Sequence, residues 1–160
     1  MPTVTKKQVL TEQQFGGVPY GNKTVLPFTF ETNASGVYVN SNQATAVAIG
    51  DVVRIGVLPA GMRLDDSLAI VSNAFTALST AKVGFAYVDG DDDTAVPQDD
   101  DYFNAALALN AAGRTRANNT AVRPVTLPKD AYVILTIAGA NLAEAGQLDL
   151  LVEGVLTGAP

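Results

Sequence analysis

The sequence contains no cysteine and no histidine. The absence of cysteine excludes disulfides and thiol nucleophiles, and the absence of histidine excludes imidazole general bases and the usual zinc ligand sets. No glycine-rich phosphate loop and no serine nucleophile elbow is present either. We therefore expect no enzymatic activity and no cofactor.

Long apolar runs are also missing, and none approaches the length of a membrane span. The first seven residues (MPTVTKK) lack the apolar core of a signal peptide. These two observations predict a protein made in a cytoplasm that does not associate with a membrane.

Charge is scarce and mostly negative. Ten basic residues stand against sixteen acidic ones, which gives a formal net charge of −6. The basic residues are scattered, whereas binding to a nucleic acid backbone requires them clustered, so we expect no nucleic acid partner. Only 16% of the residues are charged and 48% are hydrophobic, which favours a surface that contacts other proteins. A small β domain with a neutral polar surface is the alternative.

What the chain does contain is a series of β patterns. Residues Asp51–Leu58 alternate, with Val53, Ile55 and Val57 on the predicted inner face. A turn at Pro59-Ala60-Gly61 follows, and residues Leu64–Ser72 form a second predicted strand.

In this second strand Leu64, Leu68 and Ile70 are predicted to face inward, although Asp66 breaks the alternation. A third alternating run ends at Tyr87. Three strands in under forty residues indicate an antiparallel fold, because parallel strands need long crossovers.

The same patterns divide the whole chain into an N-terminal arm, residues 1–22, and a β-sandwich domain, residues 23–160. The predicted fold is all-β, an eight-stranded antiparallel sandwich of jelly-roll type with an extended arm and one short helix over Tyr102–Ala112. In the first strand Pro27 cannot donate to a ladder, which predicts an edge strand or a bulge. The eight predicted strands are Lys23–Thr32, Gly36–Asn40, Asp51–Leu58, Leu64–Ser72, Ala81–Val88, Thr120–Leu127, Ala131–Ala138 and Gln147–Leu156.

Two segments carry a resemblance to a known family. Residues 50–61 (GDVVRIGVLPAG) and 83–90 (VGFAYVDG) resemble the β-sandwich decoration, or cement, proteins on the heads of tailed bacteriophages, and residues 133–140 (VILTIAGA) extend the resemblance more weakly. The resemblance implies a structural virion protein on the capsid exterior, made in the bacterial host cytoplasm. Its partners would be the major capsid protein, whose subunits it bridges, and further copies of itself, as a homotrimer or, alternatively, a dimer.

Two sets of residues are candidates for these contacts. Residues Ala131–Ala138 are apolar on both faces, so we expect Val133 and Leu135, with Leu151 of the last strand, to form an oligomer interface. The arm is too rich in aromatic and apolar residues for a free tail. It either lies on a neighbouring subunit or folds back on its own domain, with disorder as a third option. The residues predicted to bind the capsid are Lys6, Lys7, Phe15, Val18 and Tyr20.

An acidic loop and a tyrosine suggest two other roles. Asp89, Asp91 and Asp93 have the spacing of an EF-hand start, but Thr94 stands where that loop requires glycine. We therefore expect no metal site, with an irregular Ca²⁺ site as the alternative. The alternative function is a carbohydrate-binding jelly-roll module, such as a head fibre or lectin-like domain, in which Tyr102 beside the aspartates would contact the sugar.

Overall fold

Nine strands make up the regular structure of the computed structural model, which describes residues 22–156. Within those residues there is no helix, and hence none that could span a membrane. The strands are β1 (Lys23–Thr32), β2 (Val52–Leu58), β3 (Met62–Asn73), β4 (Thr80–Tyr87), β5 (Asp99–Ala108), β6 (Gly113–Arg116), β7 (Val125–Thr126), β8 (Ala131–Ala138) and β9 (Gly146–Leu156).

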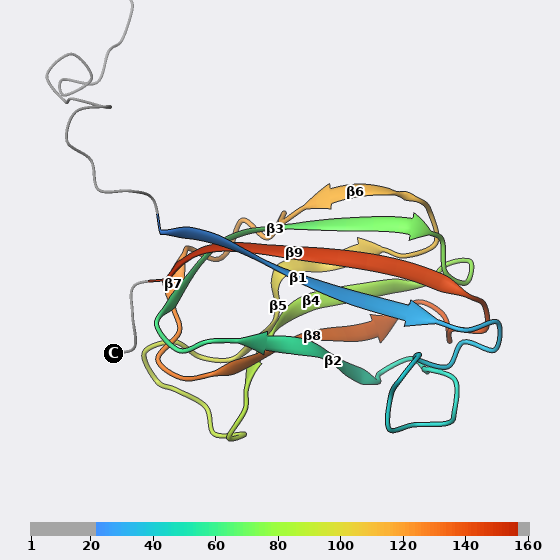
Figure 1. Ribbon diagram of the computed structural model, residues 1–160, viewed down its shortest axis with the longest axis horizontal. Coiled ribbons are helices and arrows are strands. Elements are labelled where there is room, and N and C mark those ends of the chain that lie inside the picture. The colour runs from blue at the N-terminus through green and yellow to red at the C-terminus, as the bar shows by residue number, and fades with distance from the viewer. Residues whose placement is uncertain (1–21, 157–160) are drawn as a thin grey trace, which may run out of the picture.

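The strands form two antiparallel sheets (Figure 1). One has the order β1-β9-β3-β6, with the short β7 beside β3, and the other has the order β2-β8-β4-β5. Side chains from both sheets share one core, in which Phe30, Leu64, Phe85 and Leu135 are at most 1% exposed. The predicted all-β antiparallel fold is confirmed, although the strands number nine rather than eight.

The predicted helix over Tyr102–Ala112 is wrong. Its first half belongs to β5, which pairs with β4, and the chain then turns into β6. The alanine content favours a helix intrinsically, but Leu107 and Leu109 are buried while Ala106 and Ala108 are exposed. This period of two fits a half-buried strand, so tertiary pairing overrides the helix propensity of the alanines.

Two predicted strands are mostly loop. Residues Gly36–Asn40 make only isolated bridges, between Thr32 and Tyr38 and between Val37 and Ala46. In the segment 120–127 only β7 is a strand. Gly36 and Asn40 both have a positive φ, which interrupts an extended strand in the first segment, and Pro124 has no N–H to donate to a ladder in the second.

Bulges reverse the predicted faces of two strands. The register of β2 shifts between Arg54 and Gly56, so Val57, predicted inward, is 47% exposed. In β3 the register shifts between Leu64 and Asp66, which turns Leu68 and Ile70 to the outer face. An extra residue on one strand of a pair moves every later side chain to the opposite face.

Pro27 lies in β1, which is an edge strand as predicted. Both ends of the described chain lie at one end of the sandwich, where the Leu156 amide donates to the Asn22 carbonyl (3.3 Å) and the Asn22 side chain donates to the Leu156 carbonyl (2.8 Å). The arm, with its predicted capsid-binding residues Lys6, Lys7, Phe15, Val18 and Tyr20, lies outside the described residues.

Candidate interaction surfaces

The predicted oligomer interface falls partly inside the molecule. Val133 and Leu135 of β8 are both 0% exposed and belong to the core between the sheets. The prediction chose the wrong face of β8, because the apolar residues on its two faces look alike in sequence. Leu151 of β9, by contrast, lies half-buried on the outer face of its sheet.

The outer face of the β2-β8-β4-β5 sheet carries the side chains that alternate with those core residues. Tyr132, Ile134 and Thr136 of β8 lie there, and the guanidinium of Arg54 stacks 4.5 Å from the centre of the Tyr132 ring. Val52 and Val57 of β2 add exposed apolar area, 55% and 47% exposed. Sequence reasoning missed this face because the bulge in β2 is invisible in an otherwise regular alternation.

The outer face of the other sheet carries an ion-pair network that crosses four strands. Glu153 of β9 lies 2.7 Å from Lys23 of β1 and 3.5 Å from Arg116 of β6, and Arg116 also pairs with Asp66 of β3. The hydrogen bond from Lys23 is the largest cause that lowers the pKa of the Glu153 carboxyl. Because both cations are well exposed, the network orders side chains on the surface more than it stabilises the fold.

The acidic loop is held by hydrogen bonds within the chain. Asp93 accepts the backbone N–H groups of Ala95 and Val96 at 2.9 and 3.0 Å, and Asp89 pairs with Lys129 at 2.8 Å. Side-chain acceptors of this kind define turns. The structure does not gather the carboxylates of Asp89, Asp91 and Asp93 into one cluster.

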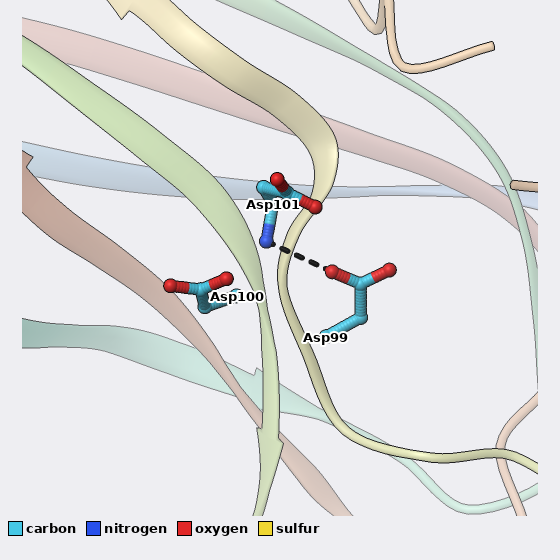
Figure 2. Close-up of side chains that lie close together, drawn as sticks. All are labelled: Asp99, Asp100 and Asp101. Carbon is cyan, nitrogen blue, oxygen red and sulfur yellow. Dashed lines mark hydrogen bonds between the residues drawn. The ribbon is translucent and has the colours of Figure 1, made fainter. Parts of the chain in front are cut away.

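A different acidic group comes together at the start of β5. Figure 2 shows Asp99, Asp100 and Asp101, whose carboxylates all offer an oxygen within 4.8 Å of one another. Asp99 accepts the Asp101 N–H at 3.0 Å, and Asp100 pairs with Lys82 at 3.0 Å. Burial, followed by the neighbouring aspartates, raises the pKa of Asp99. The cluster lies in a bulge of β5 in which the Asp99 carboxylate accepts a backbone N–H and the Asp100 carboxylate pairs with a lysine.

Tyr102, the predicted sugar contact, is only 7% exposed. Its hydroxyl donates to the Arg123 carbonyl at 2.9 Å and accepts the Val125 N–H at 3.3 Å. The ring packs against Phe85 and Phe103. It therefore cannot serve as an exposed aromatic platform for a carbohydrate.

The two ends of the sandwich differ in charge. The loops 33–51, 74–79, 109–112 and 139–145 meet at one end, at the right of Figure 1, and include only two charged residues, Asp51 and Glu144. Ile49 and Leu78 protrude there, 56% and 75% exposed. The opposite end carries the acidic loop 88–98. We refer to the end formed by the loops 33–51, 74–79, 109–112 and 139–145 as the uncharged end, since Asp51 and Glu144 are the only charged residues in those loops.

No protein-family model and no curated protein matches the chain. Its fold is similar to that of a chain in the capsid of Ralstonia phage GP4, with 20% identity, a TM-score of 0.57 and coverage of 91% of this chain and 93% of that one. It is also similar to a chain in the capsid asymmetric unit of cyanophage Pam1, with 13% identity, a TM-score of 0.58 and coverage of 98% and 99%. The protein thus has, over nearly its whole length, the fold of chains found in two phage capsids.

Proposed function

We propose that the protein is a structural virion component that binds the outer surface of a phage capsid and stabilises the lattice by bridging major capsid protein subunits. The observation that carries the proposal is the end-to-end similarity to chains of two phage capsids. Each alignment covers nearly all of both chains, so the similarity is not confined to one part of this chain. The proposal assigns no catalytic role to the chain.

The strand order supports a jelly roll. Counted from the two ends of the chain, β1 pairs with β9 and β2 with β8, and towards the middle β3 pairs with β6 and β4 with β5. This is the order obtained when one long antiparallel ribbon is wound into two four-stranded sheets. The short β7 is an addition at the side of β3.

The uncharged end is the described surface best suited to be covered by a capsid subunit. Burying a charge without a partner is costly, and the cores of protein interfaces are depleted in charged residues. Ile49 is fixed there by a hydrogen bond from its backbone N–H to the Asn141 side chain at 2.8 Å. Leu78 is held by the turn that Ser79 closes onto Thr76.

Lattice binding of this kind works through repeated weak contacts. A symmetric oligomer, for which we favour a trimer, engages several lattice sites at once, and the high effective concentration of the second and third contacts supplies the affinity. The arm residues Phe15, Val18 and Tyr20 are proposed to add contacts to neighbouring subunits.

The test uses heads of the phage that encodes this chain, assembled without it. Purified protein is added and the heads are sedimented, then imaged by electron cryomicroscopy. The proposal requires saturable co-sedimentation, density at repeated positions on the exterior, and heads that release DNA at a higher temperature. Heads that sediment free of the protein at all concentrations would overturn it.

A further inference from the structure

Among residues 22–156, the edge strands of the two sheets are β1, β2, β5, β6 and the two-residue β7, which pairs with β3 beside β6. Soluble proteins protect such edges, because unpaired backbone groups invite pairing with other chains. Pro27 interrupts β1, β6 is only four residues long, and the carbonyl of Phe103 in β5 accepts the N–H groups of Asn118 and Asn119 at 2.9 and 3.2 Å. The N-terminal half of β2 has no comparable protection among residues 22–156.

The direction of the free backbone groups in β2 follows from its pairing with β8. The Ile137 N–H donates to the Asp51 carbonyl at 3.0 Å, so this carbonyl points toward β8. Backbone groups alternate in direction along a strand, so those of Val53, two residues on, also point toward β8. Val52 and Arg54 therefore direct their N–H and C=O groups away from the sheet. These backbone groups could pair with a further strand added beside β2.

A concavity of about 740 Å³ lies directly beside this edge. It is lined by Val52, Val53 and Arg54 and by residues of the loop 38–47, among which Asn42 and Gln43 have amide side chains. Amide side chains both donate and accept, as the peptide backbone does. Arg54 makes no ion pair with any described residue, so its guanidinium is available beyond the stacking on Tyr132.

We propose that the edge of β2 and this concavity receive the N-terminal arm of a second copy of the chain, with residues 3–11 added as a strand. An extended segment that joins an exposed edge gains backbone hydrogen bonds, and alternate side chains enter the pocket beside it. The inference rests on the proposed function only in taking the protein to be a homo-oligomer.

The sequence of the arm fits this role. Residues 3–11 (TVTKKQVLT) contain five β-branched residues and no glycine or proline, whereas residues 16–21 (GGVPYG) have the glycine and proline content of a linker. Twenty-one residues precede Asn22, and a chain of that length spans about 70 Å when fully extended.

Net charge favours contact of the arm with another copy, while the concavity itself holds one acidic residue, Asp51, and the cation Arg54. Two of the ten basic residues but only one of the sixteen acidic residues precede Asn22, so the arm carries +1 and the remainder of the chain −7. Lys6 and Lys7 are therefore attracted to another copy, which would otherwise be repelled.

The first experiment is crosslinking in solution, without capsids. Because the chain has no cysteine, one copy carries V9C in the arm and the other, of different tagged mass, carries N42C in the pocket wall. A short bismaleimide should then give the mixed dimer in several-fold excess over a control pair of V9C with R114C, which is exposed on β6 at a different edge. Equal yields of the two pairs would overturn the proposal.

A chain carrying both V9C and N42C, studied at high dilution, tests the alternative that the arm occupies its own pocket. Crosslinking within one chain there, with no mixed dimer in the two-copy experiment, would overturn the assignment to a second copy. Neither result depends on capsid binding, so failure of this proposal is distinguishable from failure of the proposed function.

A matched pair of proline variants tests the edge itself. V52P removes a backbone N–H that points outward from β2, and V25P does the same on β1, two residues from Pro27. We expect V52P to weaken self-association at least tenfold by analytical ultracentrifugation, whereas V25P leaves it unchanged. Equal association of V52P and wild type would contradict the proposal. If V52P fails to fold, the crosslinking experiment still decides.

Discussion

At the scale of single residues, Gly84 shows how closely β5 crosses β4. A Cβ atom at Gly84 would lie 2.0 Å from the Asp99 carbonyl oxygen, whereas a Cβ at Gly113 would meet nothing within 4 Å. We expect G84A to lower the free energy of unfolding by about 3 kcal/mol, since overpacking against backbone cannot relax easily. G113A should change it by less than about 0.5 kcal/mol. Urea denaturation of both variants checks this, and similar midpoints would contradict it.

The two tyrosines offer a second matched comparison. The Tyr102 hydroxyl bridges the Arg123 carbonyl and the Val125 N–H, whereas the Tyr38 hydroxyl makes no hydrogen bond with a described residue. Replacing tyrosine with phenylalanine at position 102 should cost about 1 kcal/mol of stability, because both backbone groups lose their partner. Y38F should leave thermal unfolding nearly unchanged. An equal loss in the two variants would argue against this role for the Tyr102 hydroxyl.

Leu78 combines a φ of 67° with 75% exposure. The left-handed region costs a leucine roughly 1 kcal/mol, and so little of the side chain is buried that truncation forfeits little packing. L78G should therefore raise the free energy of unfolding by about 1 kcal/mol, whereas L78A should not, because alanine retains the strain. If L78G also reduces occupancy on capsids, the Leu78 side chain contacts the capsid, and that contact explains why a strained leucine is present. An L78G variant less stable than wild type would show that the loop is not strained.

At the scale of the strands, the bulges set the limit on what the sequence could predict. The alternation in residues 51–87 was sufficient to predict three antiparallel strands, and Pro27 was sufficient to predict an edge. The face of each side chain after Arg54 or Leu64 depends on where one residue is left unpaired, which is decided by contacts far away in sequence. In β2 the Phe28 ring, from a strand more than twenty residues earlier, packs against Gly56, 2.1 Å from the position that a Cβ would take.

The β5 bulge also predicts a pH dependence. The pKa of Asp99 is raised in the folded protein, chiefly by burial. A carboxyl with a raised pKa opposes folding once it ionises, so its penalty is absent below the pKa of the unfolded state and complete above the folded one. D99N should therefore be more stable than wild type at neutral pH, and the difference should vanish as the pH falls below about 4. Urea midpoints measured from pH 3 to 7 check this, and a pH-independent difference would contradict it.

At the scale of the whole molecule, the candidate surfaces were harder to predict than the fold. The low charge of the sequence pointed to a protein partner, but the concentration of the uncharged loops at one end emerges only when four separated segments meet. The pocket beside β2 was missed for the same reason, since the loop 38–47 has no pattern of its own.

Removal of residues 1–20 tests the part assigned to the arm at this scale. Every described strand begins after Asn22, so the truncated protein should retain its circular dichroism spectrum and its melting temperature as a monomer. Its occupancy on capsids should fall at least tenfold, because avidity falls when contacts between copies are lost. Full occupancy of the truncated protein, measured by co-sedimentation, would show that the arm is not needed for capsid binding.

Two hydrogen bonds join Asn22 and Leu156, so the first and last described residues lie side by side. A circular permutant with these ends linked, opened instead within the loop 38–47, would move both termini to the uncharged end. A passenger protein attached after Leu156 would be displayed at the acidic end of each copy, whereas the same passenger on the permutant would occupy the surface proposed to face the capsid. Comparing the two fusions on particles would reveal the orientation of the protein on the shell.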